Sequence, residues 1–91
     1  MPKLKAAELK AALKSVPEWK KNGPAIMRTY QFNDFVAAVK FVNAAAKLAQ
    51  KAWHHPDIDI RWNQVTFTLT THDAGGLTGK DFALARRFDR L

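Results

Sequence analysis

The stretch that decides the fold reads IDIRWNQVTFTLT and spans residues 58–70. Apolar side chains occupy every second position in both halves, with charged residues between them in the first half and threonines in the second. This period of two predicts two strands. Asn63-Gln64 is short enough for a tight turn between them, although Gln64 is not a residue that such turns prefer. The threonine face, which continues to His72, is too polar to be covered, so we expect it to form the floor of a ligand site or to face another subunit.

The longest periodic segment, about residues 34–53, precedes this hairpin and predicts an amphipathic helix. Asn33 is a suitable N-cap, and Pro56 disfavours helical geometry at His55, so the helix ends there or just before. The apolar residues that recur at helical spacing are Phe35, Val39, Val42, Ala46, Ala49 and Trp53.

The first third of the chain predicts a helix over residues 6–14, which Pro17 closes, and a short strand over residues 18–21. Asn22-Gly23 is a hairpin turn signal, and residues 26–32 alternate as a second strand. At the other end of the chain, Thr78 and Asp81 form a capping-box pattern that opens a last helix. The apolar side of that helix comprises Phe82, Leu84, Ala85, Phe88 and Leu91.

These elements follow the order α-β-β-α-β-β-α. Hairpin-linked strands with helices between them predict an α+β fold, with a four-stranded antiparallel sheet and three helices packed on one face. Ninety-one residues are enough for one hydrophobic core, so residues 1–91 are expected to form a single domain.

Composition excludes several classes of protein. No apolar run approaches the ~20 residues that span a bilayer, and no secretory signal is apparent, so we expect a cytoplasmic protein without a membrane partner. The chain has no cysteine, which excludes disulfides, thiolate nucleophiles and cysteine-ligated metal sites.

The net charge of +7 raises the possibility of a nucleic-acid partner. The excess of basic residues lies in residues 1–50, where the lysines are dispersed as on solvated helix faces and only Lys20 and Lys21 are adjacent. All three histidines lie in the nearly neutral second half. The charge therefore favours solvated helix faces over a nucleic-acid site.

The three histidines, His54, His55 and His72, are predicted to converge. The first two lie at the end of the long helix, and His72 lies at the end of the fourth strand on its polar face. Because the third and fourth strands form a hairpin, the end of the fourth returns to the level where the third begins. Each histidine taken alone is also explained as a helix-end cap or an exposed strand-end residue, so the prediction depends on their occurring together.

Two kinds of chemistry suit such a cluster. Three neutral imidazoles could hold zinc with an open fourth position, but adjacent histidines usually diverge and no acidic residue is clearly placed to orient them, so we expect no metal. Metal-free acid–base catalysis is the favoured alternative, because an imidazole with an ordinary pKa of about 6.5 exchanges protons at neutral pH.

At these residues the sequence resembles the pterin-4a-carbinolamine dehydratases, also called 4a-hydroxytetrahydrobiopterin dehydratases. The resemblance covers nearly the whole chain from Trp19 onward. The residues that carry it are Trp19, the run His54-His55-Pro56, Trp62, Thr70-Thr71-His72, Gly76-Leu77 and Asp81.

The resemblance implies a hydro-lyase that dehydrates a 4a-hydroxytetrahydropterin to the quinonoid dihydropterin and so recycles tetrahydrobiopterin, without metal or organic cofactor. It implies three catalytic histidines: His54 and His72 as acid and base, and His55, which would bind and orient the pterin and share in the proton transfer. Asp81 would orient a histidine or contact the ligand, and the aromatic residues Trp19 and Trp62 would shape the pocket wall.

One position departs from the family pattern. Four residues before His54 the family usually carries a charged residue, commonly Glu, whereas this chain has Gln50. Gln50 can hydrogen-bond a pterin amide or amino edge but carries no charge, which bears on catalytic strength more than on the fold.

The family also implies a homodimer or homotetramer in which the sheets of two subunits join across an edge. Such a partner would cover the exposed sheet edge of a small chain. The alternative function is a non-catalytic interaction or regulatory protein on the same oligomeric scaffold, or a basic nucleic-acid-binding domain.

Overall fold

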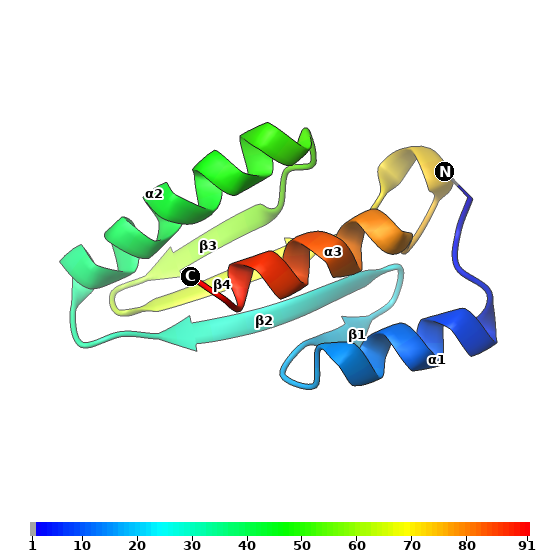
Figure 1. The fold of residues 1–91 in the computed structure, drawn as a ribbon. Helices are drawn as coiled ribbons and strands as arrows, with labels where there is room; N and C mark the ends of the chain where they lie inside the picture. The colour runs from blue at the N-terminus through cyan, green and yellow to red at the C-terminus, as the bar shows by residue number, and fades with distance from the viewer. Residues whose placement is uncertain (1) are drawn as a thin grey trace.

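Residues 2–91, which the computed structural model describes, form three α-helices and one four-stranded sheet (Figure 1). The elements are α1 (Ala6–Ser15), β1 (Lys20–Asn22), β2 (Ala25–Gln31), α2 (Phe35–Ala52), β3 (Asp57–Arg61), β4 (Gln64–Leu69), the short 3-10 helix η1 (His72–Ala74) and α3 (Gly79–Phe88). Their order confirms the predicted α+β class and the predicted succession of helices and strands.

The sheet has the strand order β1-β2-β4-β3, and every neighbouring pair is antiparallel. Its apolar face carries Ile26, Val65, Phe67 and Leu69, all fully buried, and packs against α2 and α3. Figure 1 shows α3 lying between α2, which follows the β3 side, and α1, which follows the β1 side. The core therefore lies between the helices and this face, and β3 is an edge strand.

The opposite face of the sheet is polar, as the alternation of threonines predicts. On it, the hydroxyls of Thr29 and Thr66 share a hydrogen bond of 2.7 Å between paired residues of β2 and β4. Thr66 and Thr68 are half-buried within this face.

Helix α2 turns to the core a face that overlaps only in part with the predicted stripe. Its buried residues are Ala38, Ala45 and Ala49, of which only Ala49 belongs to that stripe, and the stripe residues Phe35 and Trp53 are 52% and 70% exposed. The prediction relied on large apolar side chains, but the helix packs against the sheet through small ones. Close approach lets Phe41 stack on Phe67 of β4, with ring centroids 5.7 Å apart.

Several predicted boundaries shift by one or two residues. The N-cap of α2 is Asp34, not Asn33, because the Asp34 carboxylate accepts the Ala37 amide at 2.8 Å. The β3–β4 turn consists of Trp62 and Asn63, since Arg61 pairs with Gln64. Asn63 is buried there, and its side chain donates to the Phe32 carbonyl at 2.9 Å.

The polar strand also ends earlier than predicted. β4 stops at Leu69, so His72 begins η1 instead of extending the strand, and a single bridge between Thr71 and Gly76 closes the loop. At the C-terminus, Leu91 lies beyond α3 and is half exposed, outside the apolar side predicted for that helix. Within residues 2–91 we find no helix that combines the length and apolar character needed to cross a membrane.

Candidate active site

The site forms where α2 ends, β3 begins and β4 ends. Trp53 closes α2 in the left-handed backbone region, and its amide is directed back to the carbonyls of Ala49 and Gln50. His54 follows, with its amide bonded to the Ala49 carbonyl at 3.1 Å. Since Asp57 at the start of β3 pairs with Thr68 near the end of β4, antiparallel pairing brings the two histidine-bearing segments to one end of the sheet.

All three predicted histidines line one cavity of about 340 Å³ at this end of the sheet. That volume lies at the low end of the ~300–1,000 Å³ common for small-molecule sites. The lining residues are Trp53, His54, His55, Thr70, Thr71, His72, Asp73 and Lys80. Three of them are imidazoles, the side-chain type that most often serves as a general acid or base.

His54 is held from beneath by Asp81. The His54 Nε2 lies 2.6 Å from Asp81 Oδ1, and the Asp81 side chain is fully buried. An ionised carboxylate only accepts hydrogen bonds, so Nε2 carries the proton and donates it. Nδ1 makes no hydrogen bond with residues 2–91 and is left for proton exchange. An aspartate that fixes the tautomer and orientation of a histidine has the same role in serine proteases.

The second oxygen of Asp81 is held by two other residues. Oδ2 accepts the Thr71 hydroxyl at 2.8 Å and the Thr78 amide at 2.9 Å. Because the Thr71 proton is directed to Asp81, the 2.9 Å contact between the two threonine hydroxyls requires Thr78 to donate to Thr71. Thr78 in turn accepts the Lys80 amide as the N-cap of α3. Each polar group of this cluster therefore has a defined direction of donation.

His55 is more exposed and has a different partner. Its Nε2 lies 3.0 Å from Gln50 Oε1, and since an amide oxygen only accepts, this ring also carries its proton on Nε2. Gln50 stands four residues before His54, a spacing that would put both side chains on one face of a continuous helix. However, α2 ends at Ala52, and the left-handed turn at Trp53 directs His55 back to Gln50 instead. His72 is exposed at the start of η1.

The structure does not bring the two predicted wall residues, Trp19 and Trp62, to this cavity. Trp19 is buried in the core, where its Nε1 donates to the carboxylate of Asp89 at 3.0 and 3.2 Å. Trp62 lies in the turn at the far end of β3 and is 70% exposed. Within one chain, neither indole lines the histidine cavity.

Five lining residues were not among the predicted site residues: Trp53, Thr70, Thr71, Asp73 and Lys80. Trp53 had been assigned to the buried stripe of α2, and Lys80 follows a capping residue without any signal of its own. Thr71 did leave a signal. Its position has the opposite parity to Thr70 and His72, so alternation directs it toward the covered side of the sheet, where Asp81 lies.

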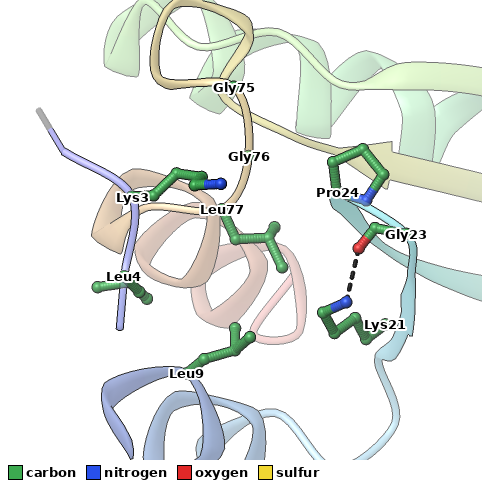
Figure 2. A pocket seen from close by; sticks show the side chains of 9 residues that line it. All are labelled: Lys3, Leu4, Leu9, Lys21, Gly23, Pro24, Gly75, Gly76 and Leu77. Carbon is green, nitrogen blue, oxygen red and sulfur yellow. Dashed lines mark hydrogen bonds between the residues drawn. The ribbon is translucent and has the colours of Figure 1, made fainter. Parts of the chain in front are cut away.

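A second hollow lies on the other side of the η1 loop, between the N-terminal segment and the β1–β2 turn (Figure 2). It measures about 180 Å³, and its apolar wall comes from Leu4, Leu9 and Leu77. Its charged side chains are Lys3 and Lys21, and the Lys21 ammonium donates to the Gly23 carbonyl at 2.8 Å. Because this hollow has no histidine or carboxylate in its lining, the histidine cavity is the stronger candidate active site of the two.

The predicted absence of a metal stays a prediction. In the part of the chain that the structure describes, no three or more His, Asp or Glu side chains are grouped as metal ligands.

Residues 2–91 match the family model described as pterin 4 alpha carbinolamine dehydratase. A Chloroflexus aurantiacus protein, provisionally named pterin-4-alpha-carbinolamine dehydratase, is 52% identical over 91 residues, which cover 100% of this chain and 98% of that protein. A Nocardia farcinica protein with the same provisional name is 52% identical over 84 residues, which cover 92% of this chain and 88% of its own.

Solved structures agree with these relatives. The crystal structure of a transcriptional coactivator/pterin dehydratase from Brucella melitensis has a TM-score of 0.92 at 36% identity, covering 97% of this chain and 96% of that one. A pterin dehydratase-like RuBisCO assembly factor of the alpha-carboxysome shares the fold, with a TM-score of 0.65 at 23% identity over 79% of this chain and 83% of its own. The chain is thus an enzyme of the dehydratase class and belongs to the pterin 4 alpha carbinolamine dehydratase family.

Proposed function

We propose that this chain dehydrates a 4a-hydroxytetrahydropterin to the quinonoid dihydropterin by histidine acid–base catalysis, and so recycles tetrahydrobiopterin. The observation that carries the proposal is the single cavity lined by His54, His55 and His72, with one imidazole held by a buried carboxylate, in a member of a dehydratase family. The cytoplasmic location stays a prediction.

The chemistry of the substrate fits such a cavity. In a pterin carbinolamine the hydroxyl and the N5 nitrogen are bound to the same carbon, C4a. An acid protonates the hydroxyl, the N5 lone pair forms the C4a–N5 double bond, and water leaves as the C–O bond breaks. A base then takes the N5 proton. The reaction needs one proton donor and one acceptor, and it involves no change of oxidation state.

The contacts suggest a division of roles. His54 and His72 act as acid and base, with the Nδ1 of His54 free because Nε2 donates to Asp81. His55, whose Nε2 donates to Gln50, binds and orients the pterin. Asp81 and Gln50 lie outside the cavity lining, so they act as positioning residues behind the two imidazoles.

The direct test is the rate of carbinolamine dehydration with purified protein against the spontaneous rate near pH 7. We expect His72→Ala to lower the enzymatic rate by about 10²–10⁴-fold, the usual contribution of an acid or base. Because His72 is exposed, its loss should leave folding intact, which thermal unfolding will check.

Lys20→Ala is the control, since Lys20 is exposed on β1 and outside the cavity lining, and its rate should equal that of the wild type. A wild-type protein that leaves the spontaneous rate unchanged would contradict the proposed activity.

We further propose that the chain forms a homodimer or homotetramer. Six large apolar side chains lie at least one-third exposed on α2, on β3 and in the adjoining turns: Phe35, Val36, Trp53, Ile58, Ile60 and Trp62. An apolar face of this kind next to an edge strand favours an interaction surface.

The same exposed face supports a second candidate function, a regulatory interaction protein on this scaffold. A pterin enzyme should bind pterins in a histidine-dependent manner with modest sensitivity to salt. A nucleic-acid binder should instead lose affinity steeply as salt rises and should depend on the basic residues of 1–50.

A further inference from the structure

We propose that Trp53 is the ring-stacking residue of the active site, against whose indole the flat pterin bicycle lies. This inference rests on the proposed function, because it names the side chain that binds the substrate of that reaction. Trp53 was not among the residues expected to contact the substrate, and its placement in the structure suggests the role.

The backbone at Trp53 is unfavourable for its side chain. Its φ of 53° and ψ of 41° lie in the left-handed region, where helices usually end on glycine or asparagine. A bulky side chain there is a steric outlier. Outliers of this kind cluster at ligand sites, where surrounding structure holds them in place.

Burial does not account for Trp53 either. The indole is 70% exposed, so it contributes little to the core of residues 2–91. Trp53 is instead one of the residues that line the histidine cavity. A large exposed aromatic beside a polar cavity is the arrangement that binds planar heterocycles, because an aromatic face stacks on a π-system regardless of its substituents.

The orientation of the indole suits this role. The rings of Trp53 and His55 are 5.5 Å apart and meet at 72°, so they form two walls of a corner. A heterocycle stacked flat on the indole would present its edge, where the ring nitrogens lie, to the imidazole side. Stacking on Trp53 would thereby orient the pterin for the histidines.

The test is binding of an unreactive oxidised pterin, biopterin, by calorimetry. We expect Trp53→Leu, which keeps apolar bulk without a π face, to raise Kd about tenfold, as loss of one aromatic stack typically does. Trp53→Phe, which keeps a π face, should bind within a few-fold of the wild type. Phe35→Leu, at the far end of α2 and outside the cavity, is the control and should bind as the wild type does.

Trp53→Asn separates a stacking role from a structural one, because asparagine tolerates the left-handed region. We expect its thermal stability to equal or exceed that of the wild type while its affinity for biopterin falls. Molar mass is measured for every variant. Two outcomes would overturn the role of Trp53 but not the proposed function: a wild-type affinity in Trp53→Leu, or a loss of affinity that accompanies a loss of oligomer. A wild-type protein that binds no biopterin would overturn both the role of Trp53 and the proposed function.

Discussion

The contact between His54 and Asp81 shows which properties of a single residue can be predicted from the sequence and which cannot. Asp81 could be predicted as a capping residue from its spacing to Thr78, because a capping box is a local pattern. Its contact with His54 spans 27 residues, and only the resemblance to the dehydratase family indicated it. The role of Thr71 depends on the side of the sheet to which its hydroxyl is directed, and the parity of its position in the alternation indicates that side.

We predict that Thr71 positions Asp81 and, through it, His54. Thr71→Val removes the hydroxyl that donates to Asp81 Oδ2 at 2.8 Å and leaves a buried carboxylate with one partner fewer. Unfolding free energy should fall by about 2 kcal/mol, the cost of losing a hydrogen bond to a charged group. The kcat should fall about tenfold with little change in KM, since small displacements of an acid–base group are costly.

Steady-state kinetics and urea unfolding measure both effects of Thr71→Val. Thr71→Ser restores the hydroxyl and should restore kcat. Thr29→Val removes a hydroxyl that pairs with Thr66 on the open sheet face, away from the cavity, and is the matched control. Equal kcat losses in Thr71→Val and Thr29→Val would contradict a positioning role.

Whole elements could be located from sequence more reliably than the faces they bury. Strands were found because their alternation is local, and their bounds differ from the prediction by one or two residues except at the end of β4, which comes three residues earlier. The buried side of α2 was predicted only in part: Ala49 belongs to the predicted stripe and is buried, whereas Ala38 and Ala45 are buried without a strong apolar signal. These small side chains let the helix approach the sheet closely. Whether a close approach is favourable depends on the surface of the sheet and cannot be read from the helix sequence.

The edge strand β3 supports a specific prediction about assembly. If two copies of β3 pair antiparallel about Ile60, Ile58 lies across from the partner's Trp62, and Asp59 lies across from the partner's Arg61. Asp59→Arg would then place like charges opposite each other, which is destabilising across a strand pair. We expect its molar mass by light scattering to fall toward the 10.3 kDa of one chain.

The charge-swapped double variant, Asp59→Arg with Arg61→Asp, recreates the cross-strand pairs and should recover the wild-type mass. The Asp59–Arg61 pair within one chain is largely exposed and contributes little stability, so folding should be retained. A wild-type protein that is monomeric at micromolar concentration would refute the assembly outright.

At the scale of the whole molecule, Asp89 joins the C-terminus to the first third of the chain. Its carboxylate accepts from Trp19 Nε1, from the Tyr30 hydroxyl and from Arg28 at 2.8 Å. These partners lie 59 to 70 residues away in sequence. No local pattern indicates such a cluster. The family resemblance assigned Trp19 to the pocket wall, whereas the structure places it in this contact.

Tyr30 gives this cluster a measurable pH dependence. Burial, reinforced by the hydrogen bond to Asp89 and its negative charge, raises the pKa of Tyr30 above the ordinary value of about 10. The folded state therefore keeps its proton where the unfolded state releases it. Stability from this group is fully present below about pH 10 and is lost as pH rises above that value.

We expect the unfolding free energy of the wild type to fall more steeply above about pH 10 than that of Tyr30→Phe, measured by urea unfolding. Tyr30 is the only tyrosine, so the ultraviolet absorbance of tyrosinate reports on it alone. That absorbance should appear together with unfolding. Tyrosinate formation near pH 10 in the folded protein would contradict a raised pKa.

The two oxygens of Asp81 have different functions. One accepts a hydrogen bond at the first turn of α3, and the other contacts an imidazole. A relative that has lost catalytic activity but keeps this fold to bind proteins could replace its histidines with little loss of stability. It could not so easily replace the aspartate, whose loss would loosen a helix. The identity of the imidazole positions, and not of the carboxylate, is therefore what should separate active members of the family from inactive descendants.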